Sequence, residues 1–304
     1  MTGRVSAIAA VALIAASAAP ATRALAPSAR KNAPRGTLFI VGGGSQSPAL
    51  VDEFISLAGG RGRARIAVVP MASSDAEGSG EEKADELREH GAAAFVLLVT
   101  TEQANRDSVV HLLDSATGIW FSGGDQLRLA RVLRGTATLA AMHRRYDAGA
   151  VVGGTSAGAA VMSDSMITGN QTRPDSDHVG YYGEDFPTVA RHTIEVVPGF
   201  AFLPRTVVDQ HFLRRQRENR LLAVILERPS LIGVGIDEGT ALRVDPDGIW
   251  RVVGASAVEI YDAHASRVTS ASAGTLGAVD VRLHLLPAGS SYDPRTRRAT
   301  LPGK

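Results

Sequence analysis

Short apolar runs that end in glycine recur through the first half of the chain. Residues 37–41 form a β-branched, apolar run that stops at Gly42, and residues 118–121 form a similar run before Gly123. Short runs without polar alternation are typical of strands that are buried on both faces of a parallel sheet. The same pattern predicts further strands over 65–69, 94–99 and 151–152.

Helical patterns lie between and after these runs, and β-rich sequence follows them. Helix-forming segments predict helices over 48–57, 81–90, 126–134 and 213–227. Alternating strands and helices with short connections indicate an α/β fold with a mainly parallel, doubly wound sheet. Sites in such sheets gather at the carboxyl ends of the strands, where the glycine turns lie. The C-terminal part is β-rich, with strand candidates over 233–236, 240–244, 250–253 and 279–286.

The N-terminal residues have the pattern of an export signal. Arg4 is followed by an uncharged, alanine-rich run over 5–21, and Ala24-Leu25-Ala26 offers a cleavage site. The run is short and weakly hydrophobic for a permanent membrane span. We therefore expect a secreted or periplasmic protein without an integral membrane segment after cleavage. The expected organisation is a signal peptide at 1–26, a linker at 27–35, one α/β domain at 36–290 and a tail at 291–304.

Composition excludes several classes of site. Lys and Arg number 32 and Asp and Glu 31 in 304 residues, a formal charge of +1, so no general attraction to nucleic acid is expected. The absence of cysteine excludes disulfides, thiolate metal sites and a cysteine nucleophile. The glycines at 42–44 lack the dinucleotide spacing because Ser47 stands where the final glycine is needed. No run has metal-ligand spacing, and we expect neither a metal nor an organic cofactor.

The strongest motif is a nucleophile elbow at residues 154–158. Gly-Thr-Ser-Ala-Gly matches G-x-S-x-G between a predicted strand and a predicted helix, which makes Ser156 the expected nucleophile. The backbone N–H of Ala157 lies at the start of that helix and could donate to an oxyanion. A second glycine turn follows the preceding strand, and Gly124 within it could supply another donor. The alternative is an ordinary glycine turn in which Ser156 caps the helix.

The base that a serine hydroxyl needs is best supplied by His211. This histidine follows an apolar run that ends in Asp209-Gln210, which places it at the carboxyl end of a strand, on the same edge as Ser156. The other histidines lie in helical stretches or outside any motif. A basic cluster follows at Arg214, Arg215, Arg217 and Arg220, which could bind substrate carboxylates or form a solvated helix face.

Three motifs together resemble the cyanophycinases: Gly-Gly-Asp-Gln at 123–126, Gly-Thr-Ser-Ala-Gly-Ala at 154–159 and Asp-Gln-His-Phe at 209–212. The tract at 233–241 is similar to a C-terminal stretch of that family. These serine peptidases are related to the aspartyl dipeptidases and to class I glutamine-amidotransferase-like folds. The resemblance implies cleavage of the polymer cyanophycin into β-Asp-Arg dipeptides, with Ser156 as nucleophile and His211 as base. It implies a substrate pocket that contains Gln126, Asp209, Gln210, Arg215, Arg217 and Arg220.

The acid of the triad is where the sequence departs from the family pattern. Alignment with the dipeptidase branch puts Gln171 where that branch has an aspartate. An amide can orient an imidazole but cannot stabilise an imidazolium by charge. We expect Asp175 as the acid because it is nearest in sequence to the expected place. Asp177, Glu184 and Asp185 lie in the same loop and are alternatives.

Other functions are compatible with these residues. A peptidase for short aspartyl or isoaspartyl peptides would use the same elbow and histidine. A non-catalytic peptide-binding protein on this fold would explain the departure at Gln171. An α/β-hydrolase esterase would share the elbow but would leave the motifs at 123–126 and 209–212 unexplained. A homodimer through an exposed sheet edge is also compatible with the sequence.

Overall fold

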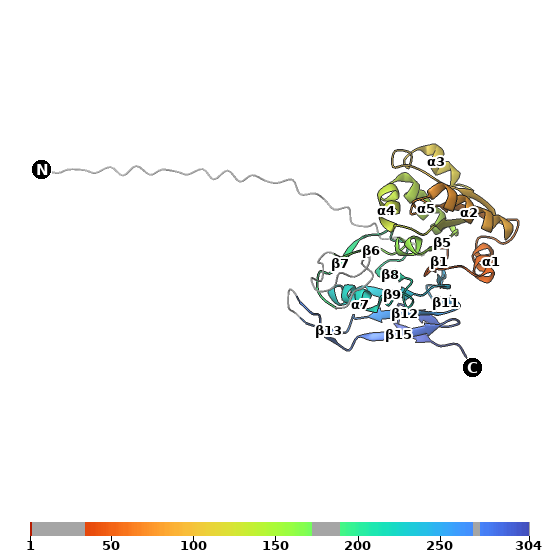
Figure 1. The fold of residues 1–304 in the computed structure, drawn as a ribbon. Coiled ribbons are helices and arrows are strands. Elements are labelled where there is room, and N and C mark those ends of the chain that lie inside the picture. Colours follow the sequence, from red (N-terminus) through yellow and green to blue (C-terminus); the bar gives the residue numbers. More distant parts are fainter. Residues whose placement is uncertain (2–33, 172–188, 270–273, 304) are drawn as a thin grey trace. The chain divides into compact units, whose positions relative to one another are not determined.

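The computed structural model describes Met1 and residues 34–171, 189–269 and 274–303. From residue 34 on, the described chain belongs to one compact unit, which spans Ala33–Lys304. Strands and helices alternate through its first half (Figure 1). Their order is β1 (Leu38–Val41), α1 (Pro48–Leu57), β2 (Arg65–Val69), α2 (Ala76–Glu89), β3 (Ala93–Val96), α3 (Asp107–Leu112), β4 (Gly118–Phe121), α4 (Gln126–Leu133), α5 (Ala137–Ala148), β5 (Val151–Thr155) and α6 (Ala157–Ala160).

The second half is mostly β. It contains one helix of ten residues, α7 (Glu218–Glu227), among the described residues. The strands are β6 (Ser165–Gln171), β7 (Ile194–Pro198), β8 (Thr206–Gln210), β9 (Ile232–Ile236), β10 (Thr240–Val244), β11 (Trp250–Gly254), β12 (Ala257–Asp262), β13 (Arg267–Val268), β14 (Ala278–Val279), β15 (Arg282–Pro287), β16 (Ser291–Asp293) and β17 (Arg298–Thr300).

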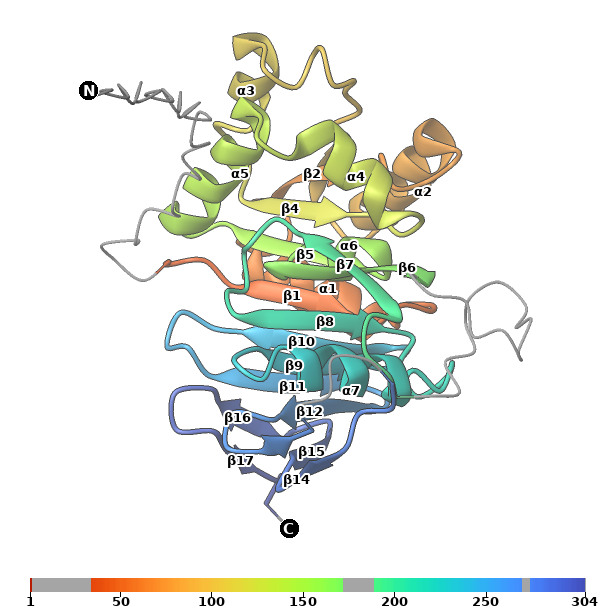
Figure 2. The same cartoon turned by 90° about the vertical axis from the view of Figure 1, so that its left-hand side faces the viewer.

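The main sheet has a parallel half and an antiparallel half. In the described chain its nine strands have the order β17-β16-β11-β10-β1-β5-β4-β2-β3. The strands from β1 to β3 in this order pair in parallel, and β10, β11, β16 and β17 add antiparallel partners beyond β1. Figure 2 shows β4, β5, β1, β10 and β11 following one another across the molecule. The expected α/β class with a mainly parallel sheet and flanking helices is therefore confirmed.

Alternate side chains of the central strands pack on opposite faces of this sheet. On β1, Phe39 and Val41 pack with the apolar side chains of α1 and α2, whereas Leu38 and Ile40 face the other side. That other face is covered by α4 and α5 and by a second, four-stranded sheet of order β15-β12-β9-β8. The second sheet thus packs on the same face of the main sheet as α6, the helix that follows Ser156.

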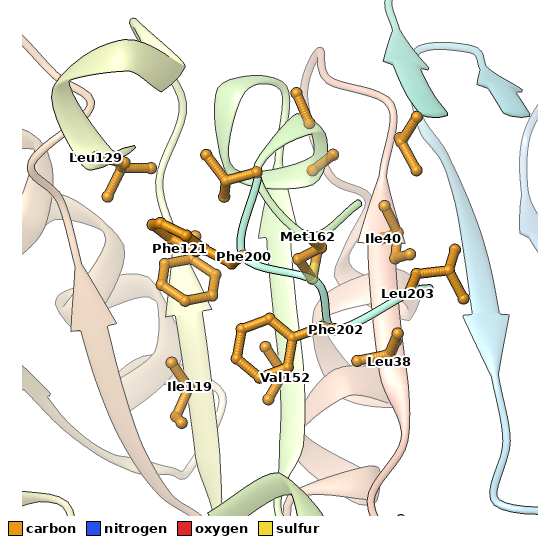
Figure 3. Close-up of a cluster of buried hydrophobic side chains, with 14 of the residues drawn as sticks. Leu38, Ile40, Ile119, Phe121, Leu129, Val152, Met162, Phe200, Phe202 and Leu203 are labelled. Carbon is orange, nitrogen blue, oxygen red and sulfur yellow. The ribbon is translucent and has the colours of Figure 1, made fainter. Parts of the chain in front are cut away.

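The core on this face links the two sheets through aromatic side chains. Phe121 of β4 has its ring centroid 5.5 Å from that of Phe200, which lies on the segment that enters β8. Figure 3 shows Phe200, Phe202 and Leu203 of this segment packed across β4, β5 and β1. Burial of one large apolar side chain contributes about 1.5–3 kcal/mol, so this segment is firmly anchored on the main sheet.

Two expectations about the chain's organisation are wrong. The expected tail at 291–304 contains β16 and β17, which extend the main sheet, so the domain continues past residue 290. The strand that ends in Asp209-Gln210 belongs to the second sheet, where β8 pairs in parallel with β9, and not to the main sheet with β5. Apart from Met1, the expected signal peptide lies outside the described residues, as does most of the expected linker. None of the described helices has the length and apolar character needed to span a bilayer.

Candidate active site

Ser156 lies in a strained turn between β5 and α6. Its φ of 54° and ψ of −113° are rare for a residue with a side chain, and such strain persists only where the surroundings enforce it. The Ser156 N–H donates to the Val41 carbonyl at 3.1 Å, which fixes the turn to the end of β1. A Cβ on Gly158 would lie 2.1 Å from the Phe121 carbonyl oxygen, so only glycine allows this close approach of α6 to β4.

His211 reaches the same place from the second sheet. It follows β8 directly, has a φ of 49°, and donates its N–H to the Gly42 carbonyl at 2.6 Å. Its ring lies against Gly43, where an added Cβ would fall 2.3 Å from the ring carbon Cε1. Gly43 also has a φ of +112°, a conformation that favours glycine. The glycine run at 42–44 therefore forms the seat for the imidazole ring.

Three side chains form one hydrogen-bonded series. His211 Nε2 lies 2.8 Å from Ser156 Oγ, and His211 Nδ1 lies 2.6 Å from Glu238 Oε1. An ionised carboxylate can only accept, so Nδ1 carries the hydrogen and Nε2 is free to accept the serine proton. This is the geometry of a nucleophile, a base and an orienting acid.

Glu238 is the residue that the sequence reasoning missed. It lies in the turn between β9 and β10, next to the glycine seat, and an added Cβ on Gly44 would lie 2.9 Å from its Cβ. The expected acid, Asp175, and its alternatives Asp177, Glu184 and Asp185 lie outside the described residues. An available signal was the position of Asp237-Glu238 directly after a buried, apolar strand, the same signal that identified His211.

Burial and neighbouring charges keep His211 uncharged. Burial is the largest cause that lowers the pKa of His211, and the cations Arg215 and Arg217 lower it further. The hydrogen bond and charge of Glu238 oppose this effect, but the net direction of the pKa is downward. The imidazole is therefore neutral at neutral pH, as a base must be.

The residues before His211 are held by a buried network of charges. Asp209, which is 1% exposed, accepts from Arg220 Nε at 2.7 Å and binds the same guanidinium through its other oxygen. Arg217 donates to the Gln210 carbonyl at 2.8 Å and to its side-chain oxygen. Both arginines are buried, so neither forms the solvated helix face that was considered. Paired buried charges fix geometry well, and here they fix the backbone that leads into His211.

The other expected pocket residues have different surroundings. Arg215 is exposed, follows the base closely, and donates its backbone N–H to the His211 carbonyl at 2.9 Å. Gln126 is buried, and its amide donates to the Ile167 carbonyl at 2.8 Å. Direct contact of these side chains with substrate stays a prediction.

The expected oxyanion donors lie on turns that flank the nucleophile. An added Cβ on Gly123 would lie 3.4 Å from the Cβ of Ser156, so the turn after β4 runs directly beside it. Gly124 follows with a φ of +133°, close against the Ala72 carbonyl. Ala157 is the first residue of α6. These placements are compatible with oxyanion donation by the Gly124 and Ala157 N–H groups, which stays a prediction.

Comparison with known families shows which family this chain belongs to. The profile of peptidase family S51 matches residues 38–252. The chain belongs to peptidase family S51. It is 32% identical over 276 residues to a cyanophycinase of Synechococcus elongatus, which covers 87% of this chain and 81% of the relative. A cyanophycinase of Geminocystis herdmanii is 31% identical over 87% of this chain and 96% of its own length.

A solved structure supports the fold of this S51 peptidase. The crystal structure of a peptidase from an acI-B1 Actinobacterium aligns with a TM-score of 0.60 over 83% of this chain and 98% of that chain, at 24% identity. The expected relation to the cyanophycinase-like serine peptidases is confirmed, and the chain is a serine-type peptidase.

The peptidase has an open cavity beside Ser156. The cavity has a volume of about 460 Å³ and is lined in part by Gly123 and Thr155, which flank Ser156. Within the described ranges, no three His, Asp or Glu side chains converge as a metal site.

Proposed function

We propose that this peptidase hydrolyses cyanophycin to β-Asp-Arg dipeptides through Ser156, His211 and Glu238. The observation that carries the proposal is the hydrogen-bonded series from Ser156 Oγ through the imidazole to Glu238. It occurs in a chain that is 31–32% identical to cyanophycinases over more than four fifths of its length.

The proposed reaction is acyl transfer through serine. Ser156 Oγ attacks the carbonyl carbon of the scissile peptide while His211 Nε2 takes its proton. Glu238 stabilises the imidazolium that forms. The imidazolium then gives the proton to the leaving amine, and an acyl ester remains on Ser156. Water, deprotonated by His211, attacks the ester and releases the second product with free Ser156.

Exposed cations beside the base support a substrate with carboxylates. The side chains of Arg214 and Arg215 are exposed directly after His211. A guanidinium binds a carboxylate through two parallel hydrogen bonds. Every β-Asp-Arg unit of the polymer carries a carboxylate on its arginine branch, so these side chains are suited to hold the chain near the nucleophile.

A turnover assay tests the proposal. The purified protein is incubated with insoluble cyanophycin, and soluble products are identified by mass spectrometry. We expect β-Asp-Arg dipeptide from the wild type and none from Ser156→Ala. Turnover of short aspartyl or isoaspartyl peptides without release from the polymer would favour the short-peptide peptidase. Turnover of neither substrate class would favour a binding protein.

We further propose that the protein is exported through its N-terminal segment. Support comes from the basic start, the apolar run and the Ala24-Leu25-Ala26 site. Expression of the full chain followed by N-terminal sequencing of secreted or periplasmic material tests this. An intact N-terminus on protein retained inside the cell would contradict it.

A homodimer is a further proposal for the mature protein. Its support is β15, the edge strand of the second sheet, on which Leu283 and Leu285 are 52% and 56% exposed. Exposed apolar side chains on an edge strand favour pairing with another chain. Sedimentation of the wild type against Leu283→Lys tests the proposal, and a monomeric wild type would contradict it.

A further inference from the structure

The cavity beside Ser156 lies between α2 and the carboxyl ends of β4 and β5. Its wall on the α2 side includes Glu82, Lys83 and Glu86, and its sheet side includes Trp120 and Ser122. A volume of about 460 Å³ is enough for an amino-acid side chain with its backbone atoms. Because Gly123 and Thr155 also line it, a group bound there lies next to the reacting bond.

Lys83, the one cation among the residues that line the cavity, already has partners within the protein. Lys83 Nζ lies 2.5 Å from Glu86 Oε2 and 2.9 Å from Gln46 Oε1. It also sits 4.4 Å from the centroid of the Trp120 ring, a cation–π contact. Only 12% of its side chain is exposed. Lys83 is therefore held against the wall, where it fixes the position of Glu86.

The wall has more negative than positive charge. Glu82 is exposed and forms no ion pair with any residue that the structure describes. Its carboxylate lies one helical turn before that of Glu86, on the same face of α2. The carboxylates of Glu82 and Glu86 and the ammonium of Lys83 together give the lining of the cavity a net charge of −1. Such a wall attracts a cationic group and repels an anionic one.

The sheet side of the cavity offers polar atoms without partners. Trp120 Nε1 and Ser122 Oγ are buried, and neither has a hydrogen-bond partner among the described residues. Buried polar atoms are seldom left unpaired, so these two point to a bound oxygen atom. The cavity thus combines donors near the nucleophile with acceptors farther out on α2.

We propose that this cavity is the specificity pocket for a guanidinium-bearing residue of the substrate. Glu82 and Glu86 accept hydrogen bonds from the guanidinium, and Trp120 and Ser122 donate to a carbonyl or carboxylate oxygen of the same residue. The inference rests on the proposed cleavage of a β-Asp-Arg substrate. It assigns recognition of the substrate's positive charge to α2, whereas the exposed arginines after His211 are suited to its carboxylates.

A pair of substrates that differ only in charge tests the pocket. The probes are synthetic oligoaspartates whose β-carboxyl groups carry either arginine or citrulline, which is a neutral near-isostere. We expect the wild type to prefer the arginine oligomer by about tenfold in kcat/KM, because charge-assisted hydrogen bonds are lost with citrulline. Glu82→Lys should abolish the preference by slowing the arginine oligomer, with little change on the citrulline oligomer.

The matched control is Glu89→Lys, the same charge reversal at an exposed position at the far end of α2 that does not line the cavity. It should keep the preference for arginine. Equal turnover of both oligomers by the wild type would contradict the proposed guanidinium pocket but not the proposed function. An unchanged preference for arginine in Glu82→Lys would also contradict the pocket and not the function. Turnover of neither oligomer by the wild type would overturn the proposed function and the pocket together.

Discussion

The carboxylate of Glu238 lies 2.6 Å from the Nδ1 atom of His211, although 27 residues separate the two in the chain. The contact forms because β8 and β9 are parallel neighbours, so the turns that follow them lie side by side. Strand pairing in the second sheet thus places the Glu238 carboxylate beside the imidazole.

Replacement of Glu238 by glutamine should lower kcat strongly with little effect on KM. The amide can still contact the imidazole but cannot stabilise the imidazolium, and the same acid-to-amide change lowers kcat by about 10⁴-fold in a comparable triad. Steady-state kinetics measure the change. Asp175→Asn is the matched comparison and should stay close to wild type. The reverse pattern would make Asp175 the acid and Glu238 a bystander.

The pH dependence of kcat/KM should reflect the environment of His211. The base works only when neutral, so activity falls as the imidazole is protonated at low pH. Burial and nearby cations lower the pKa of His211 below its ordinary value of 6.5, so this acid limb should lie below pH 6.5. Removal of one cation in Arg215→Gln should raise the pKa and move the limb upward.

Arg214→Gln provides the control for that shift. Arg214 is an exposed neighbour with the same charge, but it is not among the charges that act on the pKa of His211. Its acid limb should lie at the same pH as in the wild type, even if the loss of a substrate contact lowers kcat/KM at every pH. Equal shifts in both variants would indicate a general charge effect rather than a local one.

Loss of the Arg220 guanidinium should lower the stability of the fold more than it weakens substrate binding. Arg220→Met removes the bidentate partner of the buried Asp209 carboxylate and leaves the cation of Arg217 3.8 Å away, and breaking a buried ion pair typically costs about 3–5 kcal/mol. Urea unfolding measures the loss, and the double variant Asp209→Asn/Arg220→Met should recover part of it. Wild-type stability with a raised KM would instead return Arg220 to a role in the substrate pocket.

A methyl group on Gly43 should impair catalysis more than stability. Its Cβ would overlap the His211 ring at 2.3 Å, and a displacement of about 1 Å in a catalytic group can reduce the rate by about 10²-fold. Gly62→Ala is the matched control: Gly62 also has a positive φ, of +77°, but nothing lies within 4 Å of an added Cβ. Both variants share the backbone strain, and only Gly43→Ala should lose activity. Equal activity of the two variants would mean that the catalytic position of the His211 ring does not depend on its contact with Gly43.

Elements with local determinants were predicted well from the sequence. The bounds of α1 and β4 match the prediction, because Ser47 and Pro48 start the helix and the glycines at 123–124 end the strand. The bounds of helix α5 were not predicted, although Thr136 caps its first turn and Gly149 ends it with a φ of 118°. These two capping residues alone could have indicated where the helix begins and ends.

Features that depend on distant contacts were beyond the sequence patterns. Ser156 and His211 were found because each follows an apolar strand, but the pattern could not say that β8 lies in a second sheet. The burial of Arg217 and Arg220 depends on Asp209 and Gln210 being turned toward α7, which local charge patterning does not reveal. The same holds for Glu238, whose carboxylate reaches His211 only because β9 pairs with β8.

The division of the triad between two sheets has a consequence for the newly made chain. Ser156 belongs to the early, locally connected half, whereas its base and acid arrive 55 and 82 residues later on strands of the other sheet. A nascent or truncated chain that has formed its elbow therefore carries a serine with nothing to deprotonate it. In the proposed mechanism, hydrolytic competence therefore appears only when β8 and β9 have docked beside the elbow.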